Sequence, residues 1–343
     1  MFSPSRLAST ATRRLSTGQP SRRLLLTAAL LGATSFLPVL AQGPTYPNKP
    51  ITLIVPYPAG GANDAVGRLI GLKLGESMGQ TVIIDNRPGA GTTIGAAMAA
   101  RAAPDGYTLV LGSLASNAVS PHLMPNPGYD ALKDFAPIGL IGVAPIVATV
   151  AKDSPYISLK SLVDDAKKRP NDVMYGSSGN GSPLHLAGEL FSQSAGVKIT
   201  HVPYKGGSAH TIDMIGGRLA VIFDTTTAAM PMIKGDKIRA LAVSSPTRLA
   251  DLPNVPTFAE AGYPGFEVSG WYALYGPAKL PPALVAKLSA ELGKVMAMPD
   301  VDSKLKALAV KPSYGTPAEL GAFTESEFAK YGKVIKAANI KAD

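Results

Sequence analysis

Residues 51–64 read Ile51-Thr52-Leu53-Ile54-Val55-Pro56-Tyr57-Pro58-Ala59-Gly60-Gly61-Ala62-Asn63-Asp64. The apolar run at 51–55 predicts a buried strand, which the following prolines and glycines end. Apolar residues then recur at helical spacing at Val66, Leu69, Ile70 and Leu74. A helix therefore follows the loop, and the backbone N–H groups of its first turn can bind an anion.

Strands and helices alternate along the rest of the chain, which favours α/β domains with mostly parallel sheets. We expect strands at 81–85, 107–113, 172–175, 198–203, 219–224 and 237–244. We expect helices from 64 and 93, at 159–169, 183–195 and 210–215, from the pair Pro281-Pro282, and in the remainder of the chain.

Two apolar stretches are longer than one buried strand needs. The first, 138–150, is interpreted as a strand that leaves one domain, and the second, 265–276, as a stretch that could cross back. A chain of this length exceeds what one core usually fills. We therefore predict a hinged two-domain protein with a cleft, with domain 1 at 42–147 and 266–343 and domain 2 at 148–265.

The first 41 residues have the features of an export signal. They contain five arginines and no acid, an apolar stretch at 24–40, and the sequence Val39-Leu40-Ala41 before polar residues. Cleavage is predicted after Ala41, and Arg22-Arg23 resembles the twin-arginine export motif. Removal of the five arginines lowers the formal net charge from +9 to +4, so the basic excess does not indicate nucleic-acid binding.

The chain contains no cysteine. Thiol catalysis, disulfides and a lipid-modified cysteine anchor are therefore excluded. Together with the leader, this composition predicts an exported protein that is soluble in the periplasm.

A second glycine loop has the same design as the first. Residues 176–182 read Gly176-Ser177-Ser178-Gly179-Asn180-Gly181-Ser182 and follow a predicted strand. Ser182 is suited to cap the next helix, and Pro183 to occupy its first position. Two helix N-termini that face each other across a cleft would bind a small anion, although each loop could also be only a tight turn.

Three kinds of chemistry fit the motifs less well. The stretch at 89–95 matches G-x-G-x-x-x-G, but the dinucleotide fingerprint is absent from 60–64. The loop at 176–180 fails the G-x-S-x-G nucleophile elbow at its last position, which leaves an exported serine hydrolase as the alternative. His185 and Glu189 are spaced as two metal ligands on one helix, and two ligands are not a metal site.

Five segments together resemble the Bug family, the periplasmic solute receptors of tripartite tricarboxylate transporters. They are 56–64, 85–91, 175–182, 202–206 and 256–262, and the resemblance covers essentially the whole mature chain. It implies a Venus flytrap of two α/β domains that close on a small carboxylate, which backbone amides and ordered water bind. It also implies a monomer that serves integral membrane transporter components and has no cofactor, metal, catalytic residue or nucleic-acid partner.

The resemblance assigns ligand contacts to both domains. From domain 1 it implies Tyr57, Ala59, Gly60, Gly61, Asp64, Ser113 and Ser116. From domain 2 it implies Ser177, Ser178, Gly181, His185, Tyr204 and Asp224.

One departure from the family pattern concerns the ligand. After Tyr204-Lys205-Gly206 the family usually continues towards a Pro-Ala pair, whereas this chain has Gly207-Ser208-Ala209-His210. The resemblance therefore does not give the ligand's identity, and His210 could alter either the cleft mouth or the helix start.

A further alternative is a soluble input partner of a two-component sensor, which would bind its ligand by the same physics.

Overall fold

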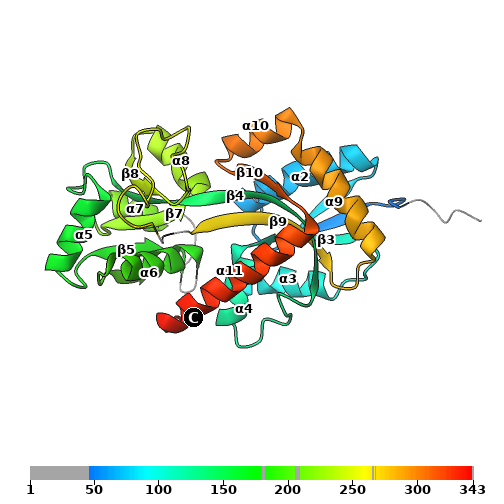
Figure 1. The fold of residues 1–343 in the computed structure, drawn as a ribbon, viewed down its shortest axis with the longest axis horizontal. Coiled ribbons are helices and arrows are strands. Elements are labelled where there is room, and N and C mark those ends of the chain that lie inside the picture. The colour runs from blue at the N-terminus through cyan, green and yellow to red at the C-terminus, as the bar shows by residue number, and fades with distance from the viewer. Residues whose placement is uncertain (1–45, 180–181, 205–208, 265, 267, 342–343) are drawn as a thin grey trace, which may run out of the picture. The chain divides into compact units, whose positions relative to one another are not determined.

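The computed structural model describes residues 46–179, 182–204, 209–264, 266 and 268–341. The predicted leader and Gly181 lie outside these ranges. Tyr46–Asp343 forms one compact unit, in which helices flank two β-sheets (Figure 1). Among the described residues, no helix is both long enough and apolar enough to span a bilayer.

The strands lie close to the predicted segments, with one addition near the C-terminus. They are β1 (Ile51–Val55), β2 (Val82–Asn86), β3 (Thr108–Ser113), β4 (Phe135–Ala151), β5 (Met174–Ser177), β6 (Thr200–Pro203), β7 (Val221–Thr225), β8 (Ile238–Val243), β9 (Ser269–Pro277) and β10 (Lys311–Gly315). Only helices were expected beyond residue 281, so β10 corrects that prediction.

The longer helices also follow the predicted pattern, with the exception of α8. They are α2 (Ala62–Met78), α3 (Thr93–Ala100), α5 (Leu159–Lys168), α6 (Pro183–Ala195), α7 (Ala209–Ile215), α8 (Thr226–Lys234), α9 (Pro282–Met296), α10 (Pro299–Ala307) and α11 (Pro317–Ala337). The short elements are η1 (Ala90–Thr92), α4 (Ser120–Leu123) and a π-helical turn, η2 (Ala115–Val119). Helix α8 was not predicted, because Pro231 interrupts its short sequence.

Strand β4 belongs to both sheets. Its first part, Phe135 to Pro145, pairs with β9, and β10 also pairs with this part. From Ile146 to Ala151 it pairs instead with β7 and β8. We call the sheet of β1–β3, β9 and β10 with its helices the first lobe, and the sheet of β5–β8 with its helices the second lobe. The interpretation of 138–150 as a crossing strand is confirmed.

Strand β9 does not itself cross back. It pairs with β3 and β4 in the first sheet, so the chain has returned to the first lobe by Ser269. Strands β1–β3 are parallel to one another, as are β5–β7, whereas β4, β8, β9 and β10 add antiparallel pairs. The expectation of mostly parallel sheets is therefore too simple, because strands that leave and re-enter a lobe run in opposite directions.

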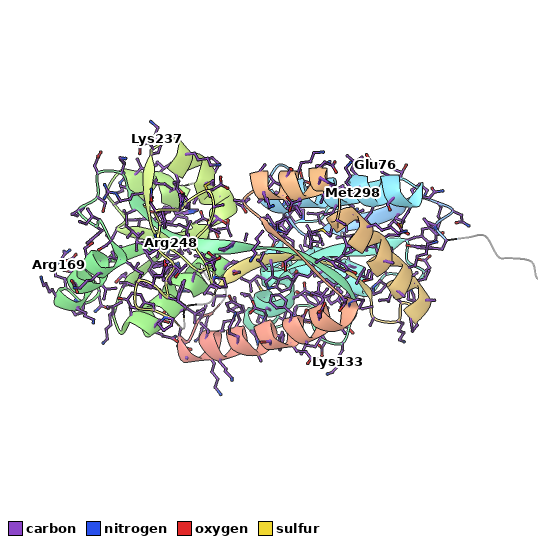
Figure 2. All side chains as sticks on the ribbon, turned by 45° about the horizontal axis from the view of Figure 1, so that its top comes forward. Glu76, Lys133, Arg169, Lys237, Arg248 and Met298 are labelled. Carbon is purple, nitrogen blue, oxygen red and sulfur yellow. The ribbon has the colours of Figure 1, made fainter. Side chains whose placement is uncertain are left out.

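Successive side chains of each strand point to opposite faces of the sheet, and helices cover both faces. In β1, Leu53 and Val55 pack into a cluster with α2, α9 and α10, whereas Ile54 joins α3 on the opposite face. In β4, Ala148 faces α5 and α6, and Val147 faces α7 and α8. Helix α11 contacts both β4 and α6, and thus touches both lobes (Figure 1). Charged side chains such as Glu76 and Lys237 lie on the outside (Figure 2).

A buried serine joins the two lobe-crossing segments. The Ser244 hydroxyl accepts a hydrogen bond from the Ile146 backbone N–H at 2.8 Å and donates one to the Val268 carbonyl at 2.5 Å. The Ser244 N–H also donates to the Ile146 carbonyl at 2.8 Å. Ser244 is only 7 % exposed, so water cannot readily replace these bonds.

We predict that Ser244→Ala destabilises the protein by about 1–3 kcal/mol, because it leaves a buried N–H and a buried carbonyl unpaired. The matched control is Ser245→Ala, since Ser245 is equally buried but its hydroxyl donates to the Thr247 carbonyl within its own loop. Urea unfolding of both variants measures the difference. Equal losses of stability in the two variants would contradict a special role for Ser244.

Candidate functional site

The carboxylate of Asp64 holds the first glycine loop in place by hydrogen bonds. The carboxylate accepts hydrogen bonds from the Gly60 N–H at 2.8 Å, from Arg68 Nε at 2.9 Å and from Asn86 Nδ2 at 2.9 Å. Asn86 Nδ2 also donates to the Tyr57 carbonyl at 3.1 Å. Asp64 is 3 % exposed. Its oxygens are thus engaged within the loop, which makes it a residue that positions the loop.

These contacts change the acidity of Asp64. The hydrogen bond from Arg68 lowers its pKa, burial opposes that effect, and the bonds from Gly60 and Asn86 lower it further, to about 2. Asn86 and Arg68 were not among the predicted site residues. Their role follows from the pairing of Val55 with Asn86 in the parallel strands β1 and β2, which places the Asn86 amide under the loop.

The loop leaves the start of α2 available to an anion. Gly60 has φ = +86°, a conformation in which glycine is favoured. Gly61 is the N-cap of α2, and no side chain caps this helix. Ala59, Gly60 and Gly61 are exposed. The first-turn N–H groups of α2 therefore have no side-chain cap and follow an exposed loop, which leaves them available to bind an anion.

A buried chain of hydroxyl groups lies beside this loop. Tyr57 Oη lies 2.7 Å from Ser113 Oγ, and Ser113 Oγ lies 3.2 Å from Ser116 Oγ. Ser116 Oγ donates to Asn117 Oδ1 at 2.6 Å. Asn117, which the sequence analysis missed, is 2 % exposed, and its Nδ2 has no partner among the described residues. The predicted group of Tyr57, Ser113 and Ser116 is therefore brought together.

The second glycine loop is organised by Ser177. Its hydroxyl accepts a hydrogen bond from the Gly179 N–H at 3.1 Å and lies 2.6 Å from His201 Nε2. Gly179 has φ = +130°, and the predicted cap is present because Ser182 Oγ accepts from the His185 N–H at 3.3 Å. Ser177 is fully buried, whereas Ser178 is half-buried.

Two imidazoles stack behind this loop. The His185 and His201 ring centroids are 3.7 Å apart with an angle of 7° between the planes. His185 Nε2 lies 3.8 Å from Glu189 Oε1, which also accepts a hydrogen bond from Tyr175 Oη at 2.7 Å. The sequence analysis missed His201, although parallel strands β5 and β6 pair Tyr175 with it. Among the described residues, no three His, Asp or Glu side chains gather as a metal site would require.

The remaining second-lobe residues have different surroundings. Tyr204 Oη donates to Asp213 Oδ2 at 2.6 Å, and burial followed by this bond raises the Tyr204 pKa to about 12. Asp224 is the next-to-last residue of β7, where one carboxylate oxygen accepts a hydrogen bond from the Thr225 N–H at 2.7 Å. The hydroxyl of Tyr204 is thus directed to α7, whereas Asp224 lies at the rim.

Residues of the two lobes meet beside Asp224. Thr226 Oγ1 donates to the Ala309 carbonyl at 3.0 Å across the lobes. Burial raises the pKa of Tyr272 on β9 to about 12, and the Asp224 charge contributes to the increase. Burial likewise raises the pKa of Tyr57, to which Tyr272 contributes electrostatically. The Thr226 hydrogen bond and the contact of Thr225 with Gly270 of β9 therefore join the end of β7 to the first lobe.

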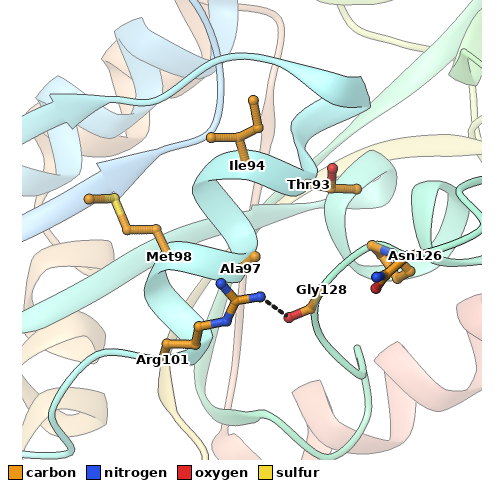
Figure 3. Close-up of a pocket in the computed structure, with 8 residues that line it drawn as sticks. Thr93, Ile94, Ala97, Met98, Arg101, Asn126 and Gly128 are labelled. Atoms are coloured by element: carbon orange, nitrogen blue, oxygen red, sulfur yellow. Dashed lines mark hydrogen bonds between the residues drawn. The ribbon is translucent and has the colours of Figure 1, made fainter.

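A surface depression outside the two glycine loops contains none of the predicted site residues. It has a volume of about 630 Å³ and lies along α3 and residues 126–128 (Figure 3). Arg101 Nη2 donates to the Gly128 carbonyl there at 3.0 Å. Neither glycine loop contributes to it, so we do not assign the site to this depression.

The fold and the paired loops are those of a two-lobed periplasmic solute-binding protein. A family model described as "Tripartite tricarboxylate transporter family receptor" matches residues 66–340. The chain belongs to this family. BugT of Bordetella pertussis is 34 % identical over 320 residues, which cover 93 % of this chain and 98 % of BugT.

Solved structures agree with this assignment. R. palustris Rpa4515 with adipate has a TM-score of 0.78 and 35 % identity, and periplasmic binding protein BugD has 0.75 and 32 %; each comparison covers 87 % of this chain and all of the other. MatC from Rhodopseudomonas palustris with bound malate has a TM-score of 0.74 and 29 % identity, over 84 % of this chain and all of MatC. The resemblance to Bug solute receptors is thereby confirmed.

We predict that Asp64→Asn weakens folding at neutral pH by on the order of 1–2 kcal/mol, because it removes the charge that Arg68 and the Gly60 N–H stabilise. The folded pKa lies below the unfolded value near 4. The contribution is therefore present above about pH 4 and is lost as the pH falls towards 2. Denaturant unfolding between pH 2 and 7 measures it.

The control for this prediction is Asp302→Asn, which removes an exposed ion pair with Lys306 on α10. We expect a change of less than about 0.5 kcal/mol for the control. An Asp64→Asn variant as stable as the wild-type protein at pH 7 would contradict the positioning role.

Proposed function

We propose that the protein captures a small organic carboxylate between its two lobes and delivers it intact to the membrane components of a tripartite tricarboxylate-type transporter. The observation that carries the ligand class is the uncapped start of α2 behind the Gly60–Gly61 loop, since backbone N–H groups there favour an anion. The adipate and malate bound to the similar proteins support a carboxylate.

The proposed site takes residues from both lobes. It comprises Tyr57, Ala59, Gly60, Gly61, Asp64, Ser113, Ser116, Ser177, Ser178, Gly181, His185, Tyr204 and Asp224. Within this set, Asp64 and Ser177 act by shaping the loops, because their polar atoms are engaged by loop backbone groups. The exposed first-lobe loop and half-buried Ser178 are the candidates for direct contact.

Binding energy would be converted into lobe closure. A ligand shifts the equilibrium only if it binds the closed form better, so it must contact both lobes at once. Strand β4 and the Ser244 hydrogen bonds keep the lobes connected during this motion. The mature protein, from residue 42, would act as a periplasmic monomer after removal of the leader.

The alternative, a serine hydrolase, is disfavoured by the surroundings of Ser177. Its hydroxyl is fully buried, and a substrate carbonyl could not reach it without movement of the loop. We propose a binding protein without catalysis. A double variant, Ser177→Ala with Ser178→Ala, separates the two functions, because turnover that is lost in this variant would show an enzyme.

A ligand screen tests the proposal. Thermal unfolding and Trp271 emission are followed with carboxylates, amino acids and aromatic acids, since Trp271 is buried on β9 next to the lobe crossing. A ligand at 100 times its Kd should stabilise the protein by about 2.7 kcal/mol and raise Tm by about 5 °C. If no compound in the screen changes either signal, the proposal is wrong.

We predict that Gly60→Ala reduces carboxylate affinity at least tenfold, because an alanine disfavours the left-handed backbone that forms the loop. The matched control is Gly79→Ala at the other end of α2. Gly79 also has positive φ and open space around its Cβ position, so both variants should lose about 1 kcal/mol of stability. Isothermal titration with the ligand from the screen measures affinity, and equal affinities of the two variants would contradict the assignment.

A further inference from the structure

A partly enclosed cavity of about 400 Å³ lies between α7, α8 and one face of the second sheet. Its apolar walls include Ile222, Met232 and Ile238. Its polar groups include His210 and Asp224. The space is sufficient for a chain of several carbons or a single ring.

His210 has unmet hydrogen-bonding capacity in this cavity. The residue is 3 % exposed, and neither ring nitrogen has a hydrogen-bond partner among the described residues. Its Nε2 lies 3.6 Å from Asp224 Oδ2, which is too long for a direct hydrogen bond. Since buried polar groups are nearly always paired, the ring of His210 is suited to hydrogen-bond a ligand that enters the cavity.

Asp224 connects this cavity with the rim where the lobes meet. It lines the cavity and is the next-to-last residue of β7, and the methyl group of the last residue, Thr225, lies against Gly270 of β9 in the first lobe. A ligand that lies where the two lobes meet can therefore extend past Asp224 towards His210.

The charges that line the cavity determine which chemical group the ligand can carry at the end opposite its carboxylate. Of the described residues that line it, Asp224 is an acid and none is Lys or Arg. A second carboxylate would face Asp224 with no fixed cation to compensate it, which is costly in a buried space. A hydroxyl or ammonium group would instead donate to Asp224 and pair with the ring of His210.

We propose that this cavity is the far subsite of the ligand cleft, and that the ligand is a monocarboxylate with an apolar spacer and a hydrogen-bond donor, a hydroxyl or an ammonium group, at its other end. This inference rests on the proposed function. It gives His210 a specificity role that the departure from the family pattern at 207–210 left open.

The test uses straight-chain acids of four to eight carbons with four far ends: methyl, hydroxyl, ammonium and carboxylate. Isothermal titration with the exported protein should show at least tenfold tighter binding of a hydroxyl- or ammonium-ended acid than of the methyl- and carboxylate-ended acids of the same length. A preference for one of the two donors identifies which group the cavity takes. A carboxylate-ended acid that binds best, or equal affinities for all four ends, would overturn the inference.

Variants link the preference to the cavity. His210→Phe keeps a ring of similar size without nitrogen atoms, and should reduce the affinity for the donor-ended acid to that of the methyl-ended acid. Ala228→Leu adds volume at the cavity from an exposed position, and should weaken long acids more than short ones. The control is Ile212→Gln. Ile212 lies on α7, as His210 does, but its side chain is 63 % exposed.

The outcomes separate this inference from the proposed function. A preference that persists in His210→Phe and in Ala228→Leu, with both variants folded by circular dichroism, would overturn the subsite while carboxylate binding remains. Absence of binding for every acid in both the wild-type protein and the control would overturn the proposed function together with the subsite.

Discussion

The structure depends on one strand that two sheets share. The first part of β4 pairs with β9 and β10, and the last six residues pair with β7 and β8. Backbone hydrogen bonds fix its register in both sheets, and its pairing changes between Pro145 and Ile146, where the proposed closure of the lobes would have its hinge. The hydroxyl of Ser244 bonds the backbone at this point and joins it to Val268 of the return segment. Both glycine loops are attached to this connection through their strands.

The charged side chains beside the first glycine loop pair with each other, which leaves the backbone N–H groups to bind an anion. Arg68 on α2 is bound to Asp64, and their pairing stabilises the loop backbone. A ligand carboxylate would therefore be recognised by N–H groups of fixed direction, whose position depends on Gly60 and on the carboxylate beneath it. Recognition of this kind is directional and requires a rigid loop, which the buried contacts of Asp64 and Asn86 supply.

Much of the fold was predictable because its signals are local. Helix α6 begins and ends as predicted, since Ser182 and Pro183 mark its start in the sequence. The antiparallel pairing of β4 with β9 joins segments more than 120 residues apart, and no local pattern contains it. Helix α8 was missed because Pro231 obscures its periodicity. The predicted domain boundaries at 147 and 265 stay predictions.

The candidate site, like the fold, was only partly predictable from local sequence. The two glycine loops could be predicted from glycine runs after apolar strands, whereas the side chains that hold these loops in place could not. Asn86, Asn117 and His201 come from neighbouring strands or turns, so their roles depend on register and on side-chain direction. Tyr204 shows the converse: its motif was recognisable, but its hydroxyl bonds Asp213 on α7. His210 stood out in the sequence only as a departure from a pattern, and its burial gives that departure a physical meaning.

The most direct test of the central claim measures the distance between the lobes. The chain has no cysteine, so Glu76→Cys and Lys237→Cys provide the only two thiols for spin labels, at exposed positions of the first and second lobes (Figure 2). Pulsed electron resonance then records the label distances with and without a carboxylate that binds. We predict a shorter and narrower distance distribution in the bound protein. An unchanged distribution at saturating ligand would contradict closure of the two lobes on a shared ligand.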